Sequence, residues 1–403
     1  MVIRMTKEEF YDKYLDFLLF KALKVNDKST LFIHMDKDSY VEKIIRCKCD
    51  EVGIKNIHFE YCSYAEKNRF LLENNLDEIK KSSLFDYSIW DVYALRGASF
   101  LILDSYFNYS ELIDSDKVYW SQKMMGESRK MYNRLVSLNK VAWCYAYLPS
   151  SDWYKKIYGV NKIDDEDMYK DFYNLCMLDK DIDEYRLKVL KRTKLLNSYK
   201  FDKLRFVNSL GTDLVVKISG GRWLSIFDYD VRGVNILPNY PSFEIYTTPD
   251  CRYTEGVVYG SKPIVYNNML IDKYWLKFEE GKVVDFGALV GYDLLRAIIE
   301  KDSGSCRLGE VSLVTNDNVI SLRKEIFYNT LFDENAGCHI ALGEGFRNCF
   351  DNGNNLMRDD LEKIGYNSSS IHVDMVMGTL DLVVYGYVGD TEYLVFEKGE
   401  ICL

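Results

Sequence analysis

The sequence predicts an α/β protein of two domains: an N-terminal α/β domain with a parallel sheet over residues 1–205, and a C-terminal α+β domain over residues 206–403. Length is the first reason, because a chain of 403 residues exceeds the size at which one hydrophobic core stops growing. The second reason is an alternation of strand-like and helix-like runs in the first third. The third is a change, after about residue 205, to period-two alternation with glycine turns.

The N-terminal segment "MVIRMTKEEFYDKYLDFLLFKALKV" has the pattern of an amphipathic helix. It is followed by "STLFIHM" as a strand, "YVEKIIRCKCDEV" as a helix, "IKNIHFEY" as a strand and later "ASFLILD" as another strand. This order is typical of a parallel sheet with crossover helices. The block from about 110 to 200 is expected to be helical, and its acidic run, residues 164–167, to be the solvated start of a helix.

The C-terminal half alternates differently. "LRFVNSLGTDLVVKISGGRW" and "YTEGVVYGSKPIVYNNMLIDKYWLKFEEGKVVDF" predict strands joined by turns, and a helix is expected at "DENAGCHIALGEGF". As a strand, "IHVDM" places His372 and Asp374 on one face and Val373 and Met375 on the other.

Composition restricts the class of protein. A net charge of −10 argues against a general nucleic-acid binder and against attraction to anionic membranes. No apolar run approaches the roughly 18 residues of a membrane span, and the N-terminus lacks the pattern of a signal peptide, so a cytoplasmic protein is expected. The ten cysteines are scattered, and Cys47 and Cys49 have the wrong spacing for a zinc knuckle or a redox pair. We expect free, mostly buried thiols.

Four segments of the second half carry acidic or imidazole side chains that a core does not need. They are "PSFEIYTTPD" with Glu244, "RLGEVSLV" with Glu310, "FDENAGCHIALGEGF" with His339, and "IHVDM" with His372 and Asp374. His339 is expected one turn into a helix that Asp333 caps. Each has a structural explanation when taken singly: an ion pair at a strand edge for Glu244, a turn for Glu310, a core histidine for His339, and a buried hydrogen-bonded pair for His372 with Asp374.

Together, three carboxylates and two imidazoles are ligands suited to zinc, cobalt or manganese. One catalytic zinc ordinarily needs three protein ligands, whereas five suit two divalent metals roughly 3.5–4 Å apart with bridging carboxylates. Such a pair lowers the pKa of a shared water and polarises a carbonyl oxygen, which is the chemistry of amide hydrolysis. The spacing of the five residues does not by itself require that they meet.

The ordered blocks "PNYPSFEIYTTPDCRYTEG", "LGEVSLV", "FYNTLFDENAGCHIALG" and "NSSSIHVDMVMG" resemble the thermophilic-aminopeptidase family of metallopeptidases, of the AmpS and PepS or aminopeptidase II type. The resemblance spans most of residues 205–390. The first half matches loosely, in "GIKNIHFEY" and "VAWCYAYLPSSDWY".

This resemblance implies a C-terminal metallopeptidase domain that removes N-terminal residues from peptides with a free N-terminus, through a water bridging two divalent metals. It implies a homodimer as well. Carried over position by position, the family's metal ligands fall on five residues: Glu244, Glu310, His339, His372 and Asp374. Glu310 and Asp374 are expected to bridge the metals, and Glu310 can also act as the catalytic base.

One position departs from the family. Seven residues after the motif histidine the family carries a tyrosine counted among the metal ligands, whereas this chain has Phe346. On a helix Phe346 would share a face with His339. A phenyl ring offers no oxygen, so we expect a loss of rate or a substitute such as Tyr328 or Tyr366.

Two alternatives therefore stay open. The first is a catalytically weakened or inactive relative that acts as a peptide-binding or scaffold dimer. The second is a metallohydrolase acting on a phosphoester, whose anionic substrate would need a basic lining. The basic residues nearest the motifs, Arg252 and Lys262, are expected to serve turns instead.

Overall fold

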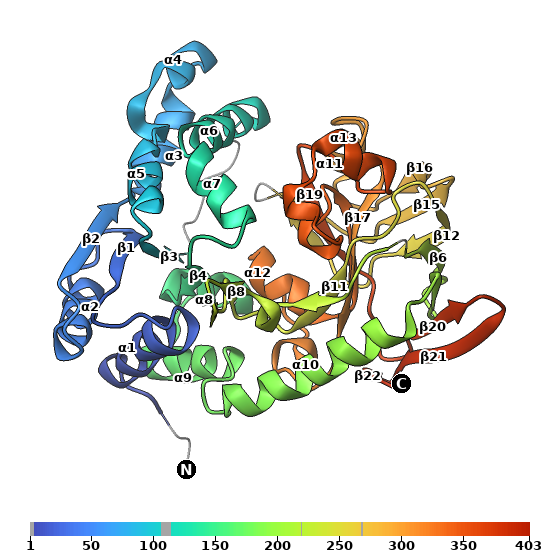
Figure 1. The fold of residues 1–403 in the computed structure, drawn as a ribbon. Helices are drawn as coiled ribbons and strands as arrows, with labels where there is room; N and C mark the ends of the chain where they lie inside the picture. Colours follow the sequence, from blue (N-terminus) through green and yellow to red (C-terminus); the bar gives the residue numbers. More distant parts are fainter. Residues whose placement is uncertain (1–3, 106–113, 219, 267–268) are drawn as a thin grey trace. The chain divides into compact units, whose positions relative to one another are not determined.

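The computed structural model describes residues 4–105, 114–218, 220–266 and 269–403 and forms two compact units (Figure 1). Unit 1 comprises Met1–Lys180 and Tyr229–Pro241, and unit 2 comprises Asp181–Asp228 and Ser242–Leu403. This division differs from the boundary expected near residue 205. Helix α10 (Ile182–Tyr199) belongs to unit 2, where Tyr185 packs against Phe227 and Phe243.

Unit 1 contains the predicted parallel sheet. Its strand order is β10-β4-β3-β1-β2, and the pairs of adjacent strands are all parallel. The strands are β1 (Thr30–Met35), β2 (Asn56–Tyr61), β3 (Ser99–Ser105), β4 (Trp143–Leu148) and β10 (Asn239–Tyr240). The segment Tyr229–Pro241 returns to unit 1 because β10 pairs with β4. It also carries the small hairpin β8 (Asp230–Val231) and β9 (Val234–Asn235).

The predicted helices of unit 1 are confirmed, with one strand among them that the prediction missed. The helices are α1 (Lys7–Asp16), continued by a π-helix (Phe17–Ala22), α2 (Ser39–Glu51), α3 (Tyr64–Glu73), α4 (Leu76–Lys81), a 3-10 turn (Ser83–Phe85), α5 (Ser88–Leu95), α6 (Ser115–Ser128), α7 (Lys130–Ser137), α8 (Ser151–Tyr158) and α9 (Asp165–Leu175). Asp164 caps α9 through the backbone N–H groups of Glu166 and Asp167, as expected for the acidic run. The prediction of a helical block from about 110 to 200 is wrong at 143–148, because β4 adds to the sheet beside β3, and residues 110–113 of that block lie outside the described ranges. Its six-residue apolar run is too short for periodicity to distinguish a strand from a helix.

Unit 2 contains an eight-stranded sheet of order β16-β15-β12-β6-β5-β20-β21-β22, with antiparallel neighbours. The strands are β5 (Lys203–Val207), β6 (Asp213–Lys217), β12 (Thr254–Tyr259), β15 (Trp275–Glu279), β16 (Lys282–Gly287), β20 (Val383–Val388), β21 (Thr391–Glu397) and β22 (Glu400–Ile401). Strands β13 (Ile264–Tyr266) and β14 (Met269–Ile271) form a separate hairpin. The predicted strands and turns of this half are confirmed.

A second sheet of unit 2, which we call the site sheet, has the order β19-β18-β17-β11-β7 and is also antiparallel. Its strands are β7 (Leu224–Ser225), β11 (Glu244–Thr247), β17 (Leu308–Val314), β18 (His339–Gly343) and β19 (His372–Val376). The remaining helices of unit 2 are α11 (Tyr292–Ile299), α12 (Thr330–Asp333), α13 (Arg358–Lys363) and 3-10 turns at Ile226–Asp228, Ile320–Leu322, Glu334–Ala336, Arg347–Cys349 and Gly353–Asn355.

All ten cysteines are free, and most are buried, as predicted. In the described ranges, no helix combines the length and the apolar character that crossing a membrane would require.

Candidate metal centre

The five side chains singled out in the sequence lie on one face of the site sheet. Residues directly opposite on neighbouring strands share a face, and residues two apart along a strand do so as well. Ala341 of β18 lies opposite Glu310 on one side and Asp374 on the other. In the same way, Gly343 lies opposite His372, and His339 lies opposite Ser312. The small residues of β18 therefore leave room above the sheet between the acidic side chains.

Glu244 reaches this face from the next strand. Tyr246 of β11 lies opposite Ser312, so Glu244, two residues earlier, shares its face. The Ser312 hydroxyl donates a hydrogen bond to the Glu244 carboxylate over 2.8 Å. Strand β11 pairs with β17 and β7, and the ion pair of Glu244 is made with His339 on the face of the sheet.

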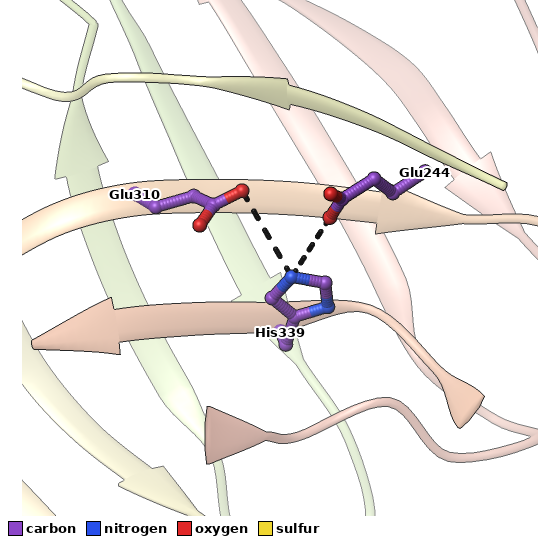
Figure 2. A group of neighbouring side chains, drawn as sticks. All are labelled: Glu244, Glu310 and His339. Atoms are coloured by element: carbon purple, nitrogen blue, oxygen red, sulfur yellow. Dashed lines mark ion pairs between the residues drawn. The ribbon is translucent and has the colours of Figure 1, made fainter. Parts of the chain in front are cut away.

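Glu244, Glu310 and His339 form the first group, in which one ligand atom from each residue lies within 4.8 Å of the others. His339 Nε2 is 3.0 Å from Glu244 Oε2 and 3.9 Å from Glu310 Oε1. Figure 2 shows both carboxylates directed at this single ring nitrogen. Glu310 and His339 are almost fully buried, with exposed fractions of 2% and 1%.

Glu310, His372 and Asp374 form the second group, again with one ligand atom each within 4.8 Å. His372 Nε2 is 3.1 Å from Glu310 Oε2 and 3.2 Å from Asp374 Oδ1. Glu310 is therefore common to both groups and uses a different oxygen toward each imidazole. The alternation predicted for β19 is confirmed, because His372 and Asp374 face this site while Val373 and Met375 are buried.

Both imidazoles are held by backbone carbonyls through their other nitrogen. His339 Nδ1 lies 3.1 Å from the carbonyl oxygen of Gly337, and His372 Nδ1 lies 2.7 Å from that of Glu344. A donated Nδ1–H bond fixes the ring so that Nε2 faces the carboxylates. This second contact is what orients metal-binding histidines in proteins.

The electrostatics of the site favour a bound positive charge. Burial, reinforced by the charge of Glu244, raises the pKa of Glu310 to about 7. Burial alone would lower the pKa of His339, but Glu244 raises it to about 10. Burial likewise opposes protonation of His372, yet Asp374 and Glu310 raise its pKa well above the ordinary value. Protonation of the two imidazoles thus offsets the negative charge of the carboxylates.

The donor set fits divalent cations. Glu310 Oε1 is buried without a hydrogen-bond partner, which is a costly state for a carboxylate oxygen unless something binds it. Among the described residues, no lysine or arginine forms an ion pair with the three carboxylates, whose ionic partners are His339 and His372. Oxygen and imidazole ligands without sulfur are suited to zinc, cobalt or manganese.

The expected helix around His339 is wrong. Only α12 and the 3-10 turn Glu334–Ala336 are helical, and His339 begins strand β18. All five residues of β18 are buried, and such a run lacks the alternation that distinguishes a strand from a helix. Asp333 does not cap a helix before His339. Its carboxylate accepts the backbone N–H groups of Phe327 and Asn329 instead.

Phe346 therefore shares no helical face with His339, since it lies beyond the end of β18. It reaches the site through the following loop, where its backbone N–H donates to the Thr248 hydroxyl over 2.8 Å. Its ring centroid lies 5.1 Å from that of His372 and 4.8 Å from that of Tyr246. The tyrosine that contacts Phe346 is thus Tyr246, which the sequence did not single out.

The other residues weighed from the sequence have structural contacts. The Tyr366 hydroxyl donates to Glu344 over 2.6 Å, and Tyr328 has a left-handed backbone with φ of 54°. Arg252 pairs with Asp250 at 2.7 Å, and Lys262 donates to the carbonyl oxygens of Arg323 and Glu325. Arg252 serves its own turn, as expected, whereas Lys262 bonds a segment 61 to 63 residues away along the chain.

Glu334, which the sequence motifs did not single out, lies in the 3-10 turn between α12 and β18. Burial and the negative charges of Glu244 and Asp374 raise its pKa well above the ordinary value, so its carboxylate belongs to the same electrostatic cluster. Its turn is anchored by Asn335, whose side chain accepts the backbone N–H of Phe243 over 2.6 Å and donates to Leu331. The signal in the sequence that could have identified Glu334 is its position five residues before His339.

Comparison with protein families agrees with this geometry. The model of the thermophilic metalloprotease (M29) family matches residues 7–401. The chain belongs to this family. The family resemblance predicted from the sequence is thereby confirmed, and it extends through the first half, where the sequence motifs matched loosely.

Relatives of this M29 metalloprotease carry aminopeptidase names. Aminopeptidase 2 of Geobacillus stearothermophilus is 28% identical over 399 residues, covering 95% of each chain. Aminopeptidase AmpS of Bacillus subtilis (strain 168) is 30% identical over 320 residues, covering 76% of this chain and 78% of that relative. The solved structure of wild-type AmpT from Thermus thermophilus has the same fold, with a TM-score of 0.88 and 23% identity over 99% of this chain and 100% of that one.

Proposed function

We propose that this M29 metalloprotease is an aminopeptidase that hydrolyses the N-terminal peptide bond with two divalent cations held on the face of the site sheet. The observation that carries the proposal is the sharing of Glu310 by two groups of potential ligands. The orientation of both histidines by backbone carbonyls supports it, and so do the names of the relatives.

Glu244, Glu310 and His339 would hold one cation, and Glu310, His372 and Asp374 the other. Glu310 is the proposed bridge because its two oxygens face different imidazoles. When bound, a pair of divalent cations supplies a Lewis acid that polarises the peptide carbonyl and lowers the pKa of a water. Zinc, cobalt and manganese all suit these ligands.

Hydrolysis also needs a group that accepts the proton of the attacking water. Glu310 is one candidate, since its pKa is raised to about 7. Glu334 is a second candidate, because it lies among the same charges and is a member of neither group of ligands. A carboxylate that neutralises two cations accepts a proton less readily, which favours Glu334.

The charge of the site also bears on the substrate. The acidic residues near the ligands outnumber the two imidazoles, and the carboxylates have no lysine or arginine partner in the described ranges. With two divalent cations bound, these carboxylates are neutralised, and within the described part of the chain no lysine or arginine adds the basic lining that an anionic phosphoester needs. An exopeptidase is therefore favoured over a phosphoesterase.

The direct test is a panel of aminoacyl p-nitroanilides assayed with added zinc, cobalt or manganese. We expect hydrolysis that depends on the metal and disappears when the amino group of the same substrate is acetylated. Metal binding without hydrolysis of any member would favour the alternative of a peptide-binding scaffold. The homodimer implied by the family resemblance is part of this proposal, and light scattering of the purified protein measures it.

A further inference from the structure

A second cluster of reactive side chains lies in unit 1, at the carboxyl edge of the parallel sheet. Cys62 directly follows β2, its backbone N–H bonds to the carbonyl oxygen of Met35, and its side chain is buried. Ser63 then caps α3, so the chain turns at once from the strand into the helix that carries Lys67. This strand–turn–helix places an amine and a thiol side by side.

The amine of Lys67 is in direct contact with the sulfur. Lys67 Nζ lies 3.0 Å from Cys62 Sγ, and it also donates to the Tyr87 hydroxyl. The Tyr87 hydroxyl in turn lies 3.9 Å from the sulfur. Because the lysine is held by two partners, it is pre-positioned against the sulfur rather than sampling solvent.

His34 completes the cluster from β1. Its Nδ1 lies 2.6 Å from Glu60 Oε2, and the same carboxylate oxygen accepts the indole N–H of Trp90 over 2.6 Å. His34 is 5% exposed and Trp90 is 1% exposed, so this arrangement is fixed by packing. Glu60 thereby orients the imidazole, which interacts with Cys62.

The thiol differs from the other buried thiols of the chain. Burial opposes ionisation of Cys62, but its hydrogen bond to His34 and the charge of Lys67 lower its pKa below the ordinary value. Burial instead raises the pKa of the other buried cysteines: Cys49, Cys144, Cys176, Cys251, Cys338 and Cys349. Since the thiolate is the form that reacts with oxidants, Cys62 is the buried cysteine prepared for oxidation.

We propose that Cys62 is an oxidation site for hydrogen peroxide, and that the oxidised sulfur is captured by Lys67 in a covalent sulfur–nitrogen link. Cys62 is 3% exposed, so its sulfur is out of reach of a second protein, and its oxidant has to be as small as hydrogen peroxide. Capture by the adjacent amine therefore takes precedence over an intermolecular disulfide.

The chemistry balances in two steps. The Cys62 thiolate attacks one peroxide oxygen, so that the O–O bond breaks, an S–O bond forms, and the departing hydroxide takes a proton from the Lys67 ammonium to give water. The neutral amine then attacks sulfur, the S–N bond forms as the S–O bond breaks, and the leaving hydroxide takes a second proton from nitrogen. Sulfur loses two electrons, peroxide is reduced to two waters, and the chain loses two hydrogen atoms.

The experiment uses the full-length protein with the exposed Cys47 and Cys402 replaced by serine, treated with hydrogen peroxide and digested with a Glu-specific protease. Cleavage at Glu60, Glu66 and Glu73 yields the peptides 61–66 and 67–73, which separate unless Cys62 and Lys67 are joined. We expect a joined pair lighter by two hydrogen atoms than the sum of the two peptides. Dithiothreitol should release them again.

Lys67→Arg is the matched variant, because it keeps the positive charge and removes the nucleophilic amine. It should lose the joined peptides and accumulate sulfenic acid at Cys62, detected as a dimedone adduct, while Cys62→Ser should show neither. Separate peptides from the oxidised parent, with Cys62 either unmodified or carrying oxygen, would overturn the proposal. The parent digest decides this by itself, and circular dichroism checks the fold of Lys67→Arg.

Discussion

The Nε2 atom of His372 lies 3.1 Å from Oε2 of Glu310, whose other carboxylate oxygen faces His339. This contact joins two strands that are not neighbours, since β18 lies between β17 and β19 and has the small residues Ala341 and Gly343 opposite Glu310 and His372. Gly343 has a φ of +104°, and a Cβ at this position would lie 2.1 Å from the carbonyl oxygen of Ile371. The close approach of β18 and β19 therefore requires glycine here.

The sharing of Glu310 predicts a hierarchy among the ligand variants. Glu310→Gln should lose both cations, whereas Glu244→Gln and Asp374→Asn should each weaken one and retain the other. Metal content per chain after dialysis measures this directly. The Glu310→Gln rate should fall by roughly 10³-fold or more, because bound metals supply several kcal/mol of charge stabilisation. Loss of a single cation from Glu310→Gln would contradict the sharing.

Glu334→Gln separates proton acceptance from metal binding. If Glu334 accepts the proton of the attacking water, kcat should fall by about 10²–10⁴-fold, the usual contribution of a general base. Metal content should stay at the parent level, because Glu334 belongs to neither group of ligands. An unchanged kcat would indicate that Glu310, not Glu334, accepts the proton of the attacking water. The matched control is Glu344→Gln, whose carboxylate bonds Tyr366 and Ser369 rather than the five ligands.

The sequence predicted the architecture where periodicity is unambiguous. Strand β19 alternates polar and apolar residues, so the shared face of His372 and Asp374 could be predicted and is confirmed. Strands β4 and β18 could not be predicted, because short apolar runs carry no alternation. Pairing with a neighbouring strand decides whether such a run forms a strand or a helix.

Predicting the site from sequence would have required the register of the paired strands. Glu244 and Glu310 lie 66 positions apart in sequence but on neighbouring strands, and no local pattern specifies that pairing. The family resemblance supplied the five residues, and the structure brings them together, while their role as metal ligands stays a prediction. Glu334 was missed because a glutamate in a helical turn is ordinarily solvated.

Phe346→Tyr tests the position where this chain departs from its family. The ring of Phe346 contacts that of His372, so a hydroxyl added here would lie beside the ligands and could donate to the developing oxyanion. We expect kcat to rise by about tenfold or more, up to the roughly 10²–10³-fold effect of one such donor. Tyr246→Phe is the companion variant, because Tyr246 contacts Phe346 and already carries a hydroxyl.

The comparison of these two variants decides which ring supplies the donor. If Tyr246 has taken over that role, Tyr246→Phe should lower kcat and the double variant should recover the parent rate. Equal kcat in the parent, both single variants and the double variant would show that no phenol acts at this position. Thermal unfolding of each variant checks that packing is intact.

The raised pKa values of the site residues predict how the stability of the metal-free protein depends on pH. The pKa of His339 is raised from 6.5 to about 10, so its stabilising contribution is complete below the unfolded value and is lost as pH rises through about 10. The pKa of Glu310 is raised from 4.5 to about 7, so its contribution is likewise lost as pH rises through about 7. The free energy of unfolding should therefore fall between about pH 5 and about pH 9, measured by urea denaturation after chelation.

A bound cation should reverse this dependence, because it occupies the place of those protons and binds only deprotonated ligands. Zinc affinity should rise over the same pH range, and titration calorimetry in buffers of different ionisation enthalpy should show proton release on binding. His339→Asn is the control, since removing this imidazole should flatten the decline in the metal-free protein and lower the number of protons released. A metal-free protein that gains stability from about pH 5 to about pH 9 would contradict the protonated state of His339 and Glu310.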